Sequence, residues 1–160
     1  MRASVRAGLA GALAVVATVA VVGVSSAEEL APYVPPTPAS GAVVAGTPCT
    51  ESARACVDIS EGRAWLLDGG EIVRGPVGIM SGDAETPTPR GTFAVQWKAE
   101  RYTSREFGVE MPYSVFFAEG GIAFHEGTRE TPSAGCVKLS HEDAKTFFEF
   151  LQVGDQVQVH

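Results

Sequence analysis

Residues 121–139 read Gly-Ile-Ala-Phe-His-Glu-Gly-Thr-Arg-Glu-Thr-Pro-Ser-Ala-Gly-Cys-Val-Lys-Leu. The short apolar run 122–124 predicts a strand that leads directly to His125, and the Glu-Gly-Thr sequence after the histidine predicts a turn. Cys136 lies eleven positions beyond the histidine. If the loop between them folds back on the strand, the imidazole and the thiol meet.

Cys136 is left over if the other two of the three cysteines pair. A leftover cysteine in an exported chain is explained by a partner chain, by an inert buried thiol or by a reactive thiol. The small residues before it favour the reactive thiol, because Gly135 lets two backbone N–H groups turn to one side as an oxyanion hole. A thiol beside histidine is expected to form a thiolate–imidazolium pair, with a pKa below the usual value of about 8.5. On spacing alone, a buried cysteine with a surface histidine remains the alternative.

The rest of the sequence predicts a mainly β fold with one helix near the C-terminal end. Ser140 is a helix N-cap candidate, because Asp143 follows three residues later and apolar residues then recur at spacings of three and four. We expect Gly154 to end this helix. Short alternating or apolar runs predict strands at 55–59, 63–67, 71–80, 92–98, 113–117 and 156–160. Many short strands with one late helix indicate a β-sandwich or barrel.

The first 27 residues have the order of a secretory signal. Arg2 and Arg6 precede the apolar run Ala7–Val24, and the small residues Ser25-Ser26-Ala27 follow, as signal peptidase requires. A retained membrane anchor is the alternative, since the run of 18 residues is just long enough to span a bilayer. We therefore expect an exported protein in the cell wall or a periplasm-like space, where disulfides are permitted and only this segment touches the membrane.

Net charge limits the classes of partner that the protein can bind, and proline content indicates where the folded domain begins. The net charge is −7, and the 12 basic residues are scattered, whereas a nucleic-acid or lipid-binding protein presents a clustered basic surface. We therefore expect no nucleic-acid partner. Residues 28–48 hold five of the ten prolines and predict an extended linker. One folded domain is then expected at 49–160.

Cys49 and Cys56 have six residues between them. In an exported domain this spacing predicts a small-loop disulfide, to which the chain-entropy model assigns about 2–3 kcal/mol. Two free buried thiols are the alternative. A metal site is not expected, because the spacing is not Cys-x-x-Cys and no histidine lies nearby. We expect no cofactor.

Four features in order resemble the L,D-transpeptidases of the YkuD type, which are exported cysteine enzymes of bacterial peptidoglycan. The first is the histidine segment 125–128 followed by Ser133-Ala134-Gly135-Cys136-Val137-Lys138-Leu139, similar to the family's Ser-x-Gly-Cys signature. The others are the Thr-Pro and Gly-Thr-Phe residues within 86–93, the Met-Pro-Tyr at 111–113, and the ending from the helix to Gly154-Asp155. The resemblance runs from about Val57 to His160.

This resemblance implies an L,D-transpeptidase-type β-sandwich or barrel at 49–160 and acyl transfer between peptidoglycan stem peptides. Cys136 would attack the carbonyl of the third stem residue, the terminal D-Ala would leave with His125 as acid, and a thioester would form. An amine of a second stem would then resolve it, giving a 3→3 cross-link. The N–H groups of Gly135 and Cys136 would hold the oxyanion, and the carbonyl of Glu126 is a candidate partner for the histidine. Carbapenem-type inhibitors are implied as well.

Tyr113, Ser133 and Lys138 are the implied substrate-binding residues. Two positions depart from the family pattern, because Ala134 stands where histidine is frequent and Lys138 where arginine or asparagine is frequent. A lysine cannot supply arginine's bidentate fork to a carboxylate. The departures bear on substrate affinity rather than on reaction type.

Two other functions remain open. The same site with water as acceptor would be an L,D-carboxypeptidase or wall hydrolase, and the sequence does not distinguish an amine from water. A non-catalytic wall-binding protein could also keep the fold. The intact His125 and Cys136 argue against that last hypothesis.

Overall fold

The computed structural model describes residues 41–160, so the predicted signal segment and residues 28–40 of the predicted linker lie outside the described residues. The strands are β1 (Ala55–Asp58), β2 (Arg63–Asp68), β3 (Glu71–Gly78), β4 (Gly91–Ala94), β5 (Trp97–Ala99), β6 (Ser114–Ala118), β7 (Ile122–Glu126), β8 (Val137–Leu139) and β9 (Gln156–Val159), and the helix is α1 (His141–Phe150). The mainly β fold with one helix near the C-terminal end is confirmed. Within 41–160, no helix is long and apolar enough to cross a membrane.

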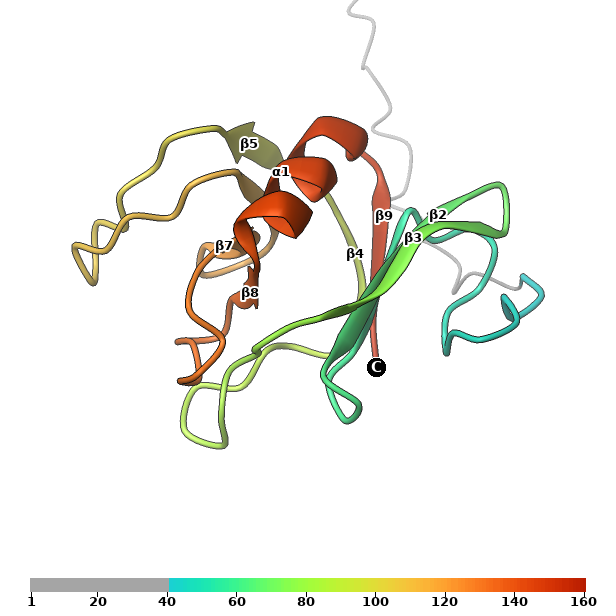
Figure 1. Cartoon of the computed structure of the whole chain (residues 1–160), viewed down its shortest axis with the longest axis horizontal. Coiled ribbons are helices and arrows are strands. Elements are labelled where there is room, and N and C mark those ends of the chain that lie inside the picture. The colour runs from blue at the N-terminus through green and yellow to red at the C-terminus, as the bar shows by residue number, and fades with distance from the viewer. Residues whose placement is uncertain (1–40) are drawn as a thin grey trace, which may run out of the picture. The chain divides into compact units, whose positions relative to one another are not determined.

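The strands form two sheets, one with the order β3-β2-β1-β9-β4 and one with the order β5-β6-β7-β8. Figure 1 shows β2, β3, β4 and β9 gathered on one side, β7 and β8 on the other, and α1 above them. Side chains from both sheets and α1 share one core, in which the Phe124 ring centroid lies 4.8 Å from that of Phe117 and 5.3 Å from that of Phe147. The two packed sheets confirm the predicted sandwich.

The helix begins where its capping residue predicted. The hydroxyl of Ser140 accepts a hydrogen bond from the Asp143 N–H at 3.2 Å, which satisfies one of the free donors of the first turn. The helix ends at Phe150, with Leu151 as C-cap, and not at Gly154 as expected. Leu151 has an extended backbone and a fully buried side chain, so burial turns the chain inward before the glycine.

Residues 92–98, expected as one strand, are divided between the two sheets. β4 pairs with β9 in the first sheet, whereas β5 pairs with β6 in the second. The change occurs at two residues, since the Val95 N–H donates to the Asp155 carbonyl at 2.8 Å and the Gln96 N–H to the Phe116 carbonyl at 2.7 Å. An alternating pattern reports which face is buried, and it carries no signal for a change of partner strand.

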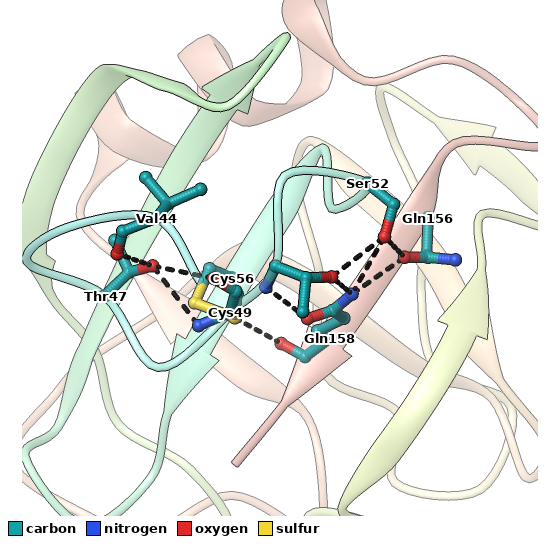
Figure 2. The surroundings of a disulfide bond; sticks show 8 residues. Val44, Thr47, Cys49, Ser52, Cys56, Gln156 and Gln158 are labelled. Carbon is teal, nitrogen blue, oxygen red and sulfur yellow. Dashed lines mark hydrogen bonds between the residues drawn. A yellow bond between two sulfur atoms is a disulfide. The ribbon is translucent and has the colours of Figure 1, made fainter. Parts of the chain in front are cut away.

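Residues 41–54 cover the outer face of the first sheet, and a disulfide between Cys49 and Cys56 closes this cover (Figure 2). Both half-cystines are fully buried, and Trp65 packs in the same cluster. Residues 41–48 were expected in the linker, but Val44 is buried in this cluster and its N–H donates to the Cys49 carbonyl at 2.8 Å. Proline content marked the linker, and it could not show which apolar residues pack back on the domain.

Gln158 joins this cover to β9. Its Oε1 accepts a hydrogen bond from the Thr50 N–H at 2.9 Å, and its Nε2 donates to the Thr50 hydroxyl at 2.7 Å (Figure 2). The side chain is buried, so both ends of the amide need these partners. Residues 49–56 are therefore held by a covalent bond and a polar network on the same face of the sheet.

We predict one free thiol per chain. Titration of the unreduced protein with a thiol reagent in denaturant should detect Cys136 alone, and the Cys136→Ser variant should give none. Replacing both Cys49 and Cys56 with serine should lower the free energy of unfolding by about 2–3 kcal/mol, because the unfolded chain loses its cross-link. Three titratable thiols in the unreduced protein would show that the bridge is absent.

Candidate active site

The site is built on the parallel pairing of β7 with β8. Phe124 lies opposite Val137 and His125 lies opposite Lys138. Successive side chains of a strand point to opposite faces, so Phe124 and Val137 enter the core while His125 and Lys138 face away from it. Cys136 precedes β8 and, with these two residues, lines a cavity of about 730 Å³.

His125 is held in one orientation by its own strand. Its Nδ1 lies 2.7 Å from the Glu126 carbonyl oxygen, which can only accept a hydrogen bond. Nδ1 therefore carries the proton, and Nε2 keeps a lone pair for proton transfer. This carbonyl is the partner that the sequence suggested for the histidine.

Burial favours the neutral forms of Cys136 and His125. It raises the pKa of the Cys136 thiol above its ordinary value, and it lowers the pKa of His125, since a charged form loses solvation when water is excluded. The charge of Lys138 lowers the pKa of the histidine further. Both shifts disfavour the thiolate–imidazolium pair expected from the sequence, and that pair stays a prediction.

The turn before the nucleophile requires glycine. Gly135 has a φ of +98°, and a Cβ at this position would lie 2.7 Å from the Cδ1 of Ile122. A left-handed residue in a turn can aim neighbouring N–H groups into one concave site for an anion. The oxyanion hole of Gly135 and Cys136 stays a prediction, and this backbone conformation is the one it needs.

Ser133 supports the same turn. Its hydroxyl donates to the Cys136 carbonyl at 2.5 Å, its N–H donates to the Ser81 carbonyl at 3.0 Å, and its carbonyl accepts from the Thr86 hydroxyl at 3.2 Å. Ser133 also lines the cavity of Cys136. The Ser133 hydroxyl is thus hydrogen-bonded to the backbone of Cys136.

Lys138 lines the same cavity, but oxygens of the preceding loop occupy its ammonium group. Its Nζ donates to the Thr131 carbonyl at 2.5 Å, to the Thr131 hydroxyl at 3.4 Å and to the Pro132 carbonyl at 3.4 Å. The residue is buried, with 8% of its surface exposed. The predicted substrate contact would have to compete with these bonds.

Tyr113 lies in a second cavity of about 580 Å³, and it does not line the cavity of Cys136. Its ring packs edge-on against His141, with 5.5 Å between ring centroids. The Nδ1 of His141 lies 2.9 Å from Oε2 of Glu126, and Glu126 lines both cavities. The structure thus brings Ser133 and Lys138 to the cavity of Cys136, and it places Tyr113 in the second cavity.

Sequence reasoning missed the loop between β5 and β6 as a wall of the cavity that Cys136 and His125 line. Phe107, Val109 and Met111 of this loop line it. Phe107 and Val109 are about half exposed, and these apolar residues in a polar stretch were the available signal. Trp97 is also 42% exposed and stacks on Phe116 with 3.6 Å between ring centroids.

Among residues 41–160, no group of three or more His, Cys, Asp or Glu side chains is arranged to hold a metal ion.

The structure is similar to solved L,D-transpeptidases. One from Stackebrandtia nassauensis is 30% identical with a TM-score of 0.63, and the alignment covers 66% of this chain and 54% of that one. One from Mycobacterium smegmatis is 25% identical with a TM-score of 0.59, covering 66% and 57%. The LD transpeptidase LdtMt1 in complex with imipenem shares the fold at 23% identity and a TM-score of 0.60, covering 69% and 60%. The chain therefore spans less than two thirds of the length of these structures.

No curated protein matches the sequence significantly. A profile of the YkuD family, described as the L,D-transpeptidase catalytic domain, matches residues 52–159, which is more than half of the chain. The chain therefore belongs to the YkuD family of L,D-transpeptidase catalytic domains.

Proposed function

We propose that the protein is an exported peptidoglycan L,D-transpeptidase that forms 3→3 cross-links between stem peptides through a thioester on Cys136. The observation that carries this proposal is one cavity lined by Cys136 and by His125, whose Nδ1–H is fixed on the Glu126 carbonyl. Membership of the family supports the reaction type. Export, directed by residues 1–27, places the enzyme beside its substrate.

Acylation in this site begins from neutral groups. As Sγ of Cys136 attacks the carbonyl carbon of the third stem residue, Nε2 of His125 takes the thiol proton, and the N–H groups of Gly135 and Cys136 stabilise the oxyanion. The C–N bond to D-Ala then breaks, and the imidazolium returns the proton to the leaving nitrogen. The products are free D-Ala and a thioester.

Transfer reverses these roles. The amine of a second stem attacks the thioester carbonyl while Nε2 of His125 takes a proton from its nitrogen. The C–S bond breaks, and the imidazolium protonates the departing thiolate of Cys136. If water attacks instead, the same steps release a tripeptide stem, which is the carboxypeptidase alternative.

We predict that the mature protein converts muropeptides with tetrapeptide stems into cross-linked dimers that have lost one D-Ala. Mass spectrometry identifies the products. Cys136→Ala should lower the rate by about a thousandfold or more, because the nucleophile is removed. The melting temperature should change little, because Cys136 is only partly buried and packs at the edge of the cluster around Phe116. Tripeptide monomers alone would establish the carboxypeptidase, and full activity of Cys136→Ala would contradict cysteine catalysis.

The neutral resting pair predicts a particular pH dependence. Because the pKa of Cys136 is raised and that of His125 is lowered, the thiol–imidazole form covers the range from about pH 6.5 to about pH 8.5. The rate of Cys136 alkylation by iodoacetamide should stay low across this range and rise at higher pH as the thiolate forms. A fast plateau that persists below about pH 6 would show a resting ion pair instead.

We also predict a covalent adduct with imipenem or meropenem. Sγ of Cys136 would open the lactam, and the ring nitrogen would take the proton from His125 and stay tethered to the acyl group. Intact-protein mass spectrometry should show one added inhibitor, with formation slowed about a hundredfold in His125→Ala. Cys136→Ser is the control, and an equal mass increase on it would contradict attack by Cys136.

A further inference from the structure

Lys138 contacts the start and the middle of the loop that joins β7 to β8. At the start of this loop, Gly127 packs on the alkyl stem, since a Cβ there would lie 2.8 Å from Cδ of Lys138. At its middle, the ammonium donates to the Thr131 carbonyl at 2.5 Å and to the Pro132 carbonyl at 3.4 Å. One side chain therefore draws the loop against the strand that follows it.

The backbone of Lys138 is fixed on both sides. It lies opposite His125 in β7. On its other side, the Met80 N–H donates to the Lys138 carbonyl at 3.0 Å, and the Lys138 N–H donates to the Met80 carbonyl at 2.8 Å. The side chain thus starts from a rigid position, so its bonds to the loop fix the loop rather than follow it.

The contact between Lys138 and the loop is linked to Cys136 through adjacent residues of the chain. Pro132 accepts from the ammonium, and Ser133, the next residue, donates its hydroxyl to the Cys136 carbonyl at 2.5 Å. A shift of residues 131–132 would therefore be passed to the turn that carries Sγ. Misplacement of a reacting atom by about 1 Å is enough to cost about a hundredfold in rate.

The hydrogen-bond partners of the Lys138 ammonium are uncharged oxygens. Within the described part of the chain no carboxylate forms an ion pair with Lys138, and three oxygens match the three donors of its protonated form. This charge acts on both reacting groups and lowers the pKa of Cys136 as well as that of His125. The other charged residues at this cavity are Glu126 of β7, which raises the pKa of His125, and Arg105, Glu106 and Glu110 of the loop before β6.

We propose that Lys138 is a positioning residue, whose ammonium fixes the loop before Cys136 and supplies a positive charge to the thiol, instead of a residue that binds a substrate carboxylate. The proposal depends on the proposed function only for the identity of the reaction that Cys136 carries out. The state of the thiol can be measured without any peptidoglycan substrate. Failure of the proposed function and failure of this inference therefore give different results.

The test compares Lys138→Met, which keeps an apolar stem without charge or donors, with Lys138→Arg, which keeps both. In Lys138→Met the rate of Cys136 alkylation at about pH 7 should fall about three- to tenfold, and its pH profile should move upward, because the thiolate loses a favourable charge. In the transpeptidase assay kcat should fall about tenfold while KM stays within about twofold. Lys138→Arg should recover most of both losses.

Lys145→Met is the matched control, because among residues 41–160 this exposed lysine of α1 pairs only with Glu149 on the same helix. It should change neither profile. An unshifted alkylation profile in Lys138→Met, or a raised KM with kcat unchanged, would overturn the proposal. If Lys138→Met does not fold, Lys138→Gln replaces it, since the amide keeps donors for the loop without the charge, and an unshifted profile there would overturn the proposal equally. A shifted profile in a protein without transpeptidase activity would leave this inference standing and remove the proposed function.

Discussion

The parallel pairing of β7 with β8 is the constraint on which the rest of the structure depends. One register places Phe124 opposite Val137 in the core and His125 opposite Lys138 on the catalytic face. A slip of one residue in either strand would exchange that strand's two faces, exposing a phenylalanine and burying a histidine among apolar groups. The energy of the core therefore maintains the geometry of the site, and no separate device is needed to align the strands.

A parallel pair of neighbouring strands also needs a connection that returns to the starting edge, usually of a dozen or more residues. Here the connection is short, residues 127–136, and it carries the nucleophile itself. A loop that presents a reacting atom must be as rigid as a strand to be effective. Bonds from Ser81 and Thr86 to Ser133 on one side and from the Lys138 ammonium on the other give this loop the support that its own conformation lacks.

Local sequence patterns predicted the elements of the fold whose conformation depends on neighbouring residues. The Ser140 cap and the apolar spacing after it are such signals, and so is the apolar run 122–124 that predicted β7. The change of sheet at Val95 and Gln96 has no such signal, because it depends on partners 20 to 60 residues away. The raised pKa of Cys136 has no local signal for a related reason, since burial depends on the whole cavity. Motifs singled out Cys136 and His125, whereas tertiary packing shifts their pKa values.

A partly buried thiol with a raised pKa suits an enzyme proposed to work outside the cytoplasm. Oxidants and disulfides react with the thiolate, so a raised pKa keeps Cys136 mostly in its unreactive form when substrate is absent. The same raised pKa makes the thiolate, once formed, a stronger nucleophile, because nucleophilicity rises with basicity. His125 can remove the proton only in its neutral form, which its lowered pKa preserves through neutral pH. The buried Cys49–Cys56 bond lies on the outer face of the other sheet, so the structure separates the disulfide from the free thiol of Cys136.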